Sequence, residues 1–322
     1  WVAVKVCRIL SAVLPSIAER RGLIDHRQVQ QDLQLLIRNQ PSTGVHEAVR
    51  CLCSVIMYIT GDLGQLLPHL KSIPALSSLC ARAETNQALG RIEKVYMSRQ
   101  IWVLAAILEN LDVDQYTRPS GGSAACTEPQ RLLPQEALGF ELVGGTVAST
   151  VADLIVRFFA LADAQIQAVT VSCLAFFLCG QRRFVKDRRI GDILSKALTS
   201  SDLTLCRKAL ETLAFVLDHF GKEAESETRA LSRRADSGAS GGGKSASAVE
   251  SAQPLSACSD AALAHITLAG GGAGRGAQLD DAAAAEVVKL RVQALTVVRH
   301  LHQQGLLNPM VALPKVFSLC FG

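Results

Sequence analysis

Apolar side chains recur along this chain at steps of three and four residues, which is the spacing of one face of an α-helix. Val45, Ala48, Leu52, Val55 and Ile59 form the first clear stripe of this kind. The other stripes are Met97, Ile101, Leu104 and Leu108; Ile166, Val169, Cys173 and Phe176; Leu203, Cys206, Leu210, Leu213 and Leu217; and Val287, Leu290, Ala294, Val297 and Leu301. Each stripe predicts an amphipathic helix whose apolar face must be buried against a neighbour.

Most of these helices follow a second apolar segment after a short connection that is rich in turn-forming residues. The paired segments and connections are residues 29–37 with 41–44, 151–161 with 162–164, and 190–198 with 199–202. Asp, Ser and Thr in such connections can accept hydrogen bonds from the free N–H groups of the next helix, and Pro with Gly can break the preceding helix. The repeating unit is therefore predicted to be a hairpin of two helices.

Equivalent positions on successive stripes are separated by a regular interval. Cys173 and Leu210 lie 37 residues apart, and two longer intervals come close to this value when two irregular stretches, described below, are left out. The 49 residues between Leu52 and Ile101 fit only if residues 61–85 contain an extra turn or a short helix. A two-helix period in this range, without convincing strand patterns, predicts an all-α fold. We expect a HEAT/armadillo-type α-solenoid of about five or six helical hairpins with two irregular insertions.

Two stretches interrupt the helical pattern and divide the chain. Residues 112–146 are broken by Pro and Gly, whereas residues 236–279 have almost no large apolar side chains to offset their ordering entropy. The predicted order is N-terminal helical repeats at 1–111, a Pro/Gly-broken insertion at 112–146, central HEAT-type hairpins at 147–235, a disordered Gly/Ser/Ala-rich linker at 236–279 and a C-terminal HEAT-type hairpin at 280–322. Because residue 1 is Trp and not Met, we expect an internal fragment of a longer protein.

The composition of the chain bears on whether it binds nucleic acid or a membrane. The chain is 49% hydrophobic, which is typical of a globular protein, and its formal net charge of +4 over 322 residues is too small to predict nucleic-acid binding by itself. Any basic surface must therefore be local. The longest uncharged stretch, residues 164–181, contains three Gln and falls short of the roughly 20 apolar residues of a membrane-spanning helix. We expect a core helix there and no membrane partner.

One short segment carries a high density of positive charge between two predicted helices. Its cations are Arg182, Arg183, Lys186, Arg188 and Arg189. Lys and Arg at this density can neutralise several phosphates, and Phe184 could either stack on a base or pack into the core. Charge runs are more often solvated surface, which leaves a plain inter-repeat loop with Phe184 packed inward as the alternative. This segment is nevertheless the strongest local candidate for binding DNA or an acidic partner.

A phosphate-binding pattern also occurs, in a context that argues against it. Residues 238–245 satisfy G-x-x-x-x-G-K-S, ending in Lys244 and Ser245. In a true phosphate-binding loop, a buried strand before the pattern and a helix after it hold the backbone N–H groups around the phosphates. Here no strand leads in, and a Gly/Ser-rich linker produces such a match by composition alone. A nucleotide-binding enzyme that uses Lys244 and Ser245 is therefore the least favoured alternative.

Other chemistry has no positive support in the sequence. Cys51 and Cys53 lie two residues apart on a predicted helix, as do His300 and His302, so the members of each pair point about 200° apart and cannot chelate one ion. No Ser-His-Asp or Cys-His grouping stands out. We predict no catalytic residues, no metal site, no cofactor and no enzymatic activity.

Near the end of the chain, Gln304-Gly305-Leu306 is followed by Pro309 and, five residues later, by Pro314. Gly305 suits a left-handed helix C-cap, Pro309 suits a first helical turn, and Pro314 would kink or restart a helix. This segment resembles a signature of the Nipped-B family, the adherins that load cohesin on chromosomes, in which a repeat helix ends in Gln-Gly-Leu. Residues 152–223 and the insertion at 236–279 are similar to the same family in order and spacing.

The resemblance implies the central part of a hook-shaped HEAT-repeat solenoid in the nucleus, on chromatin. It implies a non-enzymatic scaffold for sister chromatid cohesion in the cell cycle, whose partners are the kleisin and ATPase heads of cohesin together with DNA. It also implies that a small helical-repeat loader partner binds outside this chain. The cations between Arg182 and Arg189 match no motif of the family. Transport or trafficking adaptors of the importin or adaptin kind share the hairpin period, so they remain the main alternative.

Overall fold

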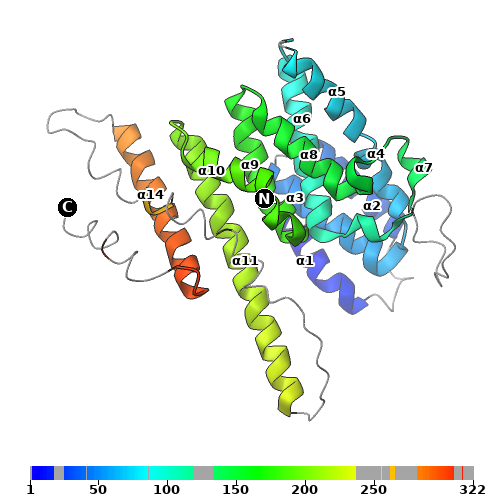
Figure 1. Ribbon diagram of the computed structural model, residues 1–322. Helices are drawn as coiled ribbons and strands as arrows, with labels where there is room; N and C mark the ends of the chain where they lie inside the picture. Colours follow the sequence, from blue (N-terminus) through cyan, green and yellow to red (C-terminus); the bar gives the residue numbers. More distant parts are fainter. Residues whose placement is uncertain are drawn as a thin grey trace. The chain divides into compact units, whose positions relative to one another are not determined.

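The computed structural model places the chain in two compact units, Trp1–Gln181 and Arg182–Gly322. The residues that the structure describes are 2–17, 25–40, 42–85, 87–118, 133–236, 255, 262–264, 281–307 and 314. The division into five segments predicted from composition stays a prediction. Residues 119–132 of the first insertion and most of the second insertion lie outside the described residues. Figure 1 shows the helices and strands of the described residues.

The first unit is built from three helical hairpins in two layers (Figure 1). The first helices of the hairpins are α2 (His26–Asn39), α5 (Ile73–Glu84) and α8 (Val147–Ala160). The second helices are α3 (Ser42–Val55), α6 (Arg91–Asn110) and α9 (Ala164–Gly180). In the layer of second helices, α3 packs on α6 and α6 packs on α9, while α5 packs on α8 in the other layer. The first helix of the chain, α1 (Val2–Ile17), packs on α3. This stacking is the architecture of an α-solenoid.

The apolar stripes form the interfaces between these helices. The side chains of Val45, Leu52, Ile101, Leu104 and Cys173 are all buried. Helix α9, which covers nearly all of the long uncharged stretch, packs on α6 and on α8 and buries many of its side chains. It is a core helix, as predicted. Among the described helices, none combines the length and the apolar character required to cross a membrane.

The irregular interval after the first stripe has a structural explanation. Helix α3 continues into a π-helical turn, Ile56–Thr60, which ends at Gly61 in the left-handed conformation with φ of 68°. A 3₁₀ turn η3 (Leu63–Leu66) and a short helix α4 (Leu67–Leu70) then precede α5. The extra short helix expected from the 49-residue spacing is therefore present.

Two of the predicted connections contain the helix caps expected of them. The prediction of a connection at residues 41–44 is wrong. Asp163 caps α9 by accepting a hydrogen bond from the N–H of Ile166 at 2.9 Å, and Asp202 accepts one from Thr204 N–H at 2.8 Å. At 41–44, however, α3 already begins at Ser42. Gly44 lies inside the helix because of packing: a Cβ there would meet the Cβ of Gln40 at 2.9 Å.

Asp163 joins two repeats and gives this unit a pH-sensitive contact. Its carboxylate pairs with Lys94 on α6 at 2.7 Å. Burial alone would raise the pKa of Asp163, but the hydrogen bonds from Lys94 and from the Ile166 N–H outweigh it and hold the pKa below its ordinary value. A lowered folded-state pKa stabilises the fold above the ordinary pKa of about 3.9, and this contribution disappears as the pH falls through the folded pKa.

We expect Asp163→Ala to lower the free energy of unfolding by about 1 kcal/mol at pH 7, because the cap and the ion pair are both lost. Asp163→Asn should cost less, since its amide oxygen can still accept from the Ile166 N–H. The difference between wild type and Asp163→Asn should shrink between pH 7 and about pH 3 as the carboxylate takes up a proton. Urea unfolding followed by circular dichroism at both pH values measures this, and a constant difference would contradict the ion pair.

The described parts of the stretch after α6 fold back on the solenoid. Its described elements are the 3₁₀ turns η4 (Val113–Gln115) and η6 (Val143–Gly145), the short helix α7 (Gln135–Leu138) and two-residue strands β1 (Thr117–Arg118) and β2 (Leu133–Pro134). The strands pair in parallel, with Thr117 opposite Leu133. Asp114 accepts a hydrogen bond from the N–H of Val147, the first residue of α8, at 2.7 Å. In the described part of the chain, this pair of strands is the whole of the β structure.

The second unit contains a hairpin of two helices and a third helix that packs on the hairpin (Figure 1). Its elements are the 3₁₀ turn η7 (Arg182–Lys186) and the helices α10 (Arg188–Leu198), α11 (Leu203–Asp236) and α14 (Asp281–Gln303). Helix α11 packs on both α10 and α14. The predicted stripe on α11 is buried except at its start, where Leu203 is 43% exposed because it occupies the first turn.

Helix α14 ends as predicted. Gly305 adopts the left-handed conformation with φ of 68°, and the N–H of Leu306 donates to the carbonyl oxygen of Leu301 at 2.8 Å. This is the hydrogen-bond pattern of a glycine C-cap. Gln304 adds a tertiary contact by donating from its amide to the main-chain oxygen of Leu217 on α11. Pro309 lies outside the described residues, and Pro314 is described as a single helical residue.

Candidate partner-binding surfaces

The basic segment predicted from sequence is ordered by its own residues. Arg182–Lys186 form the turn η7, and Phe184 and Val185 are buried and anchor that turn. Asp187 then caps α10 by accepting from the N–H of Arg189 at 2.9 Å. The cations therefore lie on a 3₁₀ turn and on the first turn of a helix. Phe184 packs inward, so its ring is not available to stack on a base.

The positive side chains of this segment differ in how strongly they are held. Arg182 pairs with Glu223 on α11, and its guanidinium carbon lies 5.8 Å from the centre of the Phe220 ring. Arg183 lies over the Phe184 ring at 5.1 Å. Cation–π contacts of this kind fix a guanidinium without cancelling its charge. Arg182 is therefore held by both an acid and a ring, and Arg183 is held against the ring of its neighbour Phe184.

The remaining three cations surround the N-terminus of α10. Arg189 pairs with Asp187 at 2.8 Å, and its hydrogen bond holds the pKa of that carboxyl below its ordinary value. Lys186 and Arg188 are exposed, and within the described residues neither makes an ion pair. A ligand that carries several phosphates or carboxylates would meet these two side chains first, because they have no competing acid.

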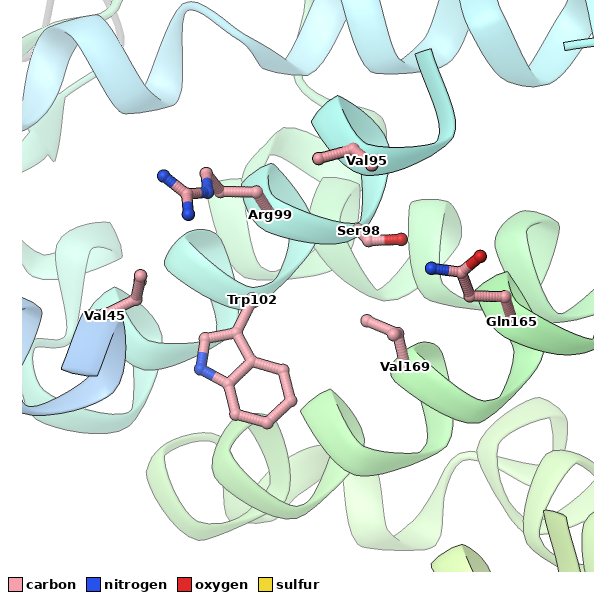
Figure 2. A pocket seen from close by; sticks show the side chains of 7 residues that line it. All are labelled: Val45, Val95, Ser98, Arg99, Trp102, Gln165 and Val169. Carbon is pink, nitrogen blue, oxygen red and sulfur yellow. The ribbon is translucent and has the colours of Figure 1, made fainter. Parts of the chain in front are cut away.

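A second surface, which the sequence reasoning missed, lies on the first unit (Figure 2). It is a pocket of about 310 Å³ where α3, α6 and α9 approach one another. Its lining residues are Val45 from α3; Val95, Ser98, Arg99 and Trp102 from α6; and Gln165 and Val169 from α9. We call this surface the α6–α9 groove. It lies on the layer of second helices. The sequence pattern predicted the buried faces of these helices but gave no role to their outer faces.

A row of contacting rings adjoins the α6–α9 groove at Trp102. Trp102 contacts Phe176 edge to face, with ring centres 5.2 Å apart, and Phe176 stacks on His46 at 4.2 Å. His46 Nε2 in turn lies 2.5 Å from a carboxylate oxygen of Glu109. The row joins α3, α6 and α9 and therefore helps to hold three repeats together. Only one signal in the sequence could have indicated this surface, namely that Trp102 lies off the buried stripe of its helix.

The cysteines and histidines that were weighed as metal ligands form no ligand cluster within the described residues. Cys51 and Cys53 are buried, and burial raises the pKa of Cys53 to about 12, so this thiol stays protonated at neutral pH. Burial also lowers the pKa of His300. Within the described ranges, no group of three His, Cys, Asp or Glu side chains could hold a metal ion. Lys244 and Ser245 lie outside the residues that the structure describes.

Comparisons with known proteins identify the fold. No protein-family model matches the chain. No curated protein matches its sequence. Among solved structures, the chain is similar to the Chaetomium thermophilum cohesin loader SCC2, C-terminal fragment, with a TM-score of 0.70 and 15% identity, over 99% of this chain and 21% of that one. The chain thus spans about a fifth of the length of the structure it matches. This likeness confirms the predicted all-α solenoid fold.

Proposed function

We propose that this chain is part of a non-enzymatic scaffold of the cohesin-loading machinery, which binds cohesin and chromatin DNA to promote sister chromatid cohesion. The observation that carries the proposal is the similarity to the SCC2 fragment over 99% of this chain. The Gln304–Pro314 segment, which resembles the Nipped-B family, supports it independently, and Gly305 has the left-handed conformation that this signature requires. A scaffold of this kind acts in the nucleus, on chromatin.

The mechanism that we propose is geometric. Stacked hairpins bury their apolar stripes against one another, and the outer faces of the second helices remain available for an elongated partner. The kleisin and the ATPase heads of cohesin are the expected partners. The five cations of the basic segment would add a salt-dependent attraction to DNA or to an acidic protein surface. The resemblance to the loader family implies that any effect on ATP hydrolysis is exerted at cohesin's own site.

Binding to purified cohesin tests the proposal. The tagged 322-residue chain should retain a complex of the ATPase heads and the kleisin, and should raise its ATP turnover while hydrolysing no ATP alone. Lys244→Ala should leave both results unchanged. A helical-repeat transport adaptor of similar length is the matched control. Retention of transport cargo or coat components in place of cohesin would assign the chain to the importin or adaptin class, and nucleotide hydrolysis that depends on Lys244 would make it an enzyme.

A further inference from the structure

Helix α6 presents a partly exposed stripe in which basic and apolar side chains are mixed. Arg91, Val95, Arg99 and Trp102 follow one another at steps of four, four and three residues, so they lie on one face of the helix. Val95 is 52% exposed, and the neighbouring Ile92 is 85% exposed. Basic and apolar side chains thus alternate along this face and lead into the α6–α9 groove. A mixed surface of this kind suits a partner that is both apolar and acidic.

The charge of the α6–α9 groove is of one sign. Arg99 donates hydrogen bonds to the main-chain oxygens of Gln40 at 2.6 Å and of Ile37 at 3.3 Å. These acceptors are neutral, so they hold the guanidinium in position and leave its charge uncompensated. None of the seven lining residues is Asp or Glu. The groove therefore offers a fixed cation next to an apolar pocket.

Two acids on or beside the helices that line this surface already have partners. Asp163, at the start of α9, pairs with Lys94 at 2.7 Å. Glu109, at the far end of the ring row, contacts His46 at 2.5 Å. Because both carboxylates are engaged, neither competes for Arg99. The positive field at the groove is therefore available to an incoming carboxylate.

The pocket also contains polar atoms that lack hydrogen-bond partners. Trp102 Nε1 and Ser98 Oγ are both buried, and neither has a partner among the described residues. Figure 2 shows the indole nitrogen on the side of Val45 and the Ser98 hydroxyl directed toward Gln165. Indole N–H is a donor only, and a buried donor without an acceptor costs free energy. If these side chains turned toward the pocket, a ligand's carbonyl or carboxylate oxygen could accept their hydrogen bonds.

We propose that the α6–α9 groove binds a linear acidic peptide segment of a partner protein. The segment inserts an aromatic or branched aliphatic side chain beside Trp102, Val95 and Val169 and places a carboxylate against Arg99. A pocket of about 310 Å³ is large enough for such an anchor. Nucleic acid fits less well, because this surface has an apolar wall and few cations. The inference concerns a different surface from the basic segment, and its test requires neither cohesin nor DNA.

Selection of peptides from a random phage-displayed library on the full 322-residue chain tests this proposal. We expect the enriched peptides to combine an apolar anchor with nearby Asp or Glu. The sequence contains two Trp, Trp1 and Trp102, so a Trp1→Phe background leaves Trp102 as the sole indole reporter. Synthetic copies of the enriched peptides should change the Trp102 fluorescence on titration. Failure to enrich any peptide, or enrichment without an acidic bias, would overturn the proposal.

Substitutions of Val95 separate charge from packing. Val95→Glu should weaken the selected peptides at least tenfold, because a like charge faces the incoming carboxylate. Val95→Lys removes the same apolar side chain but should keep affinity within about threefold, because it adds a favourable charge. Leu35→Glu on α2 is the matched control: Leu35 is 53% exposed, does not line the groove, and its variant should bind like wild type. Equal weakening by Glu and Lys, or competition by single-stranded DNA, would contradict an acidic peptide as the occupant.

Discussion

Gly180→Ala should destabilise the first unit by about 3 kcal/mol or more, because two backbones meet at this glycine. A Cβ at position 180 would lie 2.0 Å from the carbonyl oxygen of Leu108 and 2.4 Å from the Cα of Glu109. Both atoms belong to the main chain of α6, so no change of side-chain rotamer can relieve the clash. Helices α6 and α9 must therefore separate, and closely packed interiors tolerate such shifts poorly.

The same chain provides a control for this result. Gly191 lies within α10, and a Cβ there would meet no atom within 4 Å. Gly191→Ala should therefore stabilise the protein slightly, by about 0.5–1 kcal/mol, since alanine restricts the unfolded chain and favours the helix. Urea unfolding followed by circular dichroism compares both variants with wild type. Similar effects of the two substitutions would contradict the close approach of α9 to α6.

The disruption caused by Gly180→Ala should extend to the α6–α9 groove. Its walls come from the two helices that Gly180 holds together, and Trp102 contacts Phe176 across the same interface at 5.2 Å. A Gly180→Ala protein that still folds should therefore show a changed Trp102 emission in the Trp1→Phe background. Gly191→Ala, which lies in the other unit, should leave that emission unchanged.

The helices could be predicted because burial imposes the three- and four-residue spacing on the sequence. Leu52, Ile101 and Cys173 lie at the centres of their stripes, and all three are buried. The cap at Asp163 and the C-cap at Gly305 were also predictable, since both depend on the chemistry of one residue and its immediate neighbours. Local sequence is sufficient wherever the interaction that decides the structure is local.

Features that depend on distant neighbours could not be predicted in this way. Gly44 looks like a helix breaker in sequence, yet it lies inside α3 because its lack of a side chain allows contact with Gln40. The α6–α9 groove combines residues from three repeats, between Val45 and Val169, and no spacing rule brings them together. Within the basic segment, the density of charge was visible, but the pairing of Arg182 with Glu223 depends on the packing of the second unit.

Reversing the charge of Lys186 and Arg188 should weaken DNA binding on the order of 100-fold at low salt. These two side chains are exposed and make no ion pair within the described residues, so their substitution by Glu should leave the fold intact. Arg182 and Arg189, by contrast, pair with Glu223 and Asp187, and their reversal would also place like charges together. The double variant Lys186→Glu with Arg188→Glu therefore measures the attraction to phosphate without disturbing the structure of the turn.

The salt dependence distinguishes phosphate contacts from a general charge effect. Titration of a fluorescent DNA duplex at 50 and at 200 mM salt should show that Lys186→Glu with Arg188→Glu lowers the slope of log affinity against log salt by about two, one for each lost phosphate contact. Arg50→Glu with Lys71→Glu changes the net charge equally at exposed positions of the first unit and should leave the slope nearly unchanged. Equal affinity of wild type and the Lys186 and Arg188 variant at both salt concentrations would identify the basic segment as solvated surface. Because Phe184 is already packed inward, the remaining attraction can only be electrostatic, and high salt should therefore abolish the difference between the two proteins.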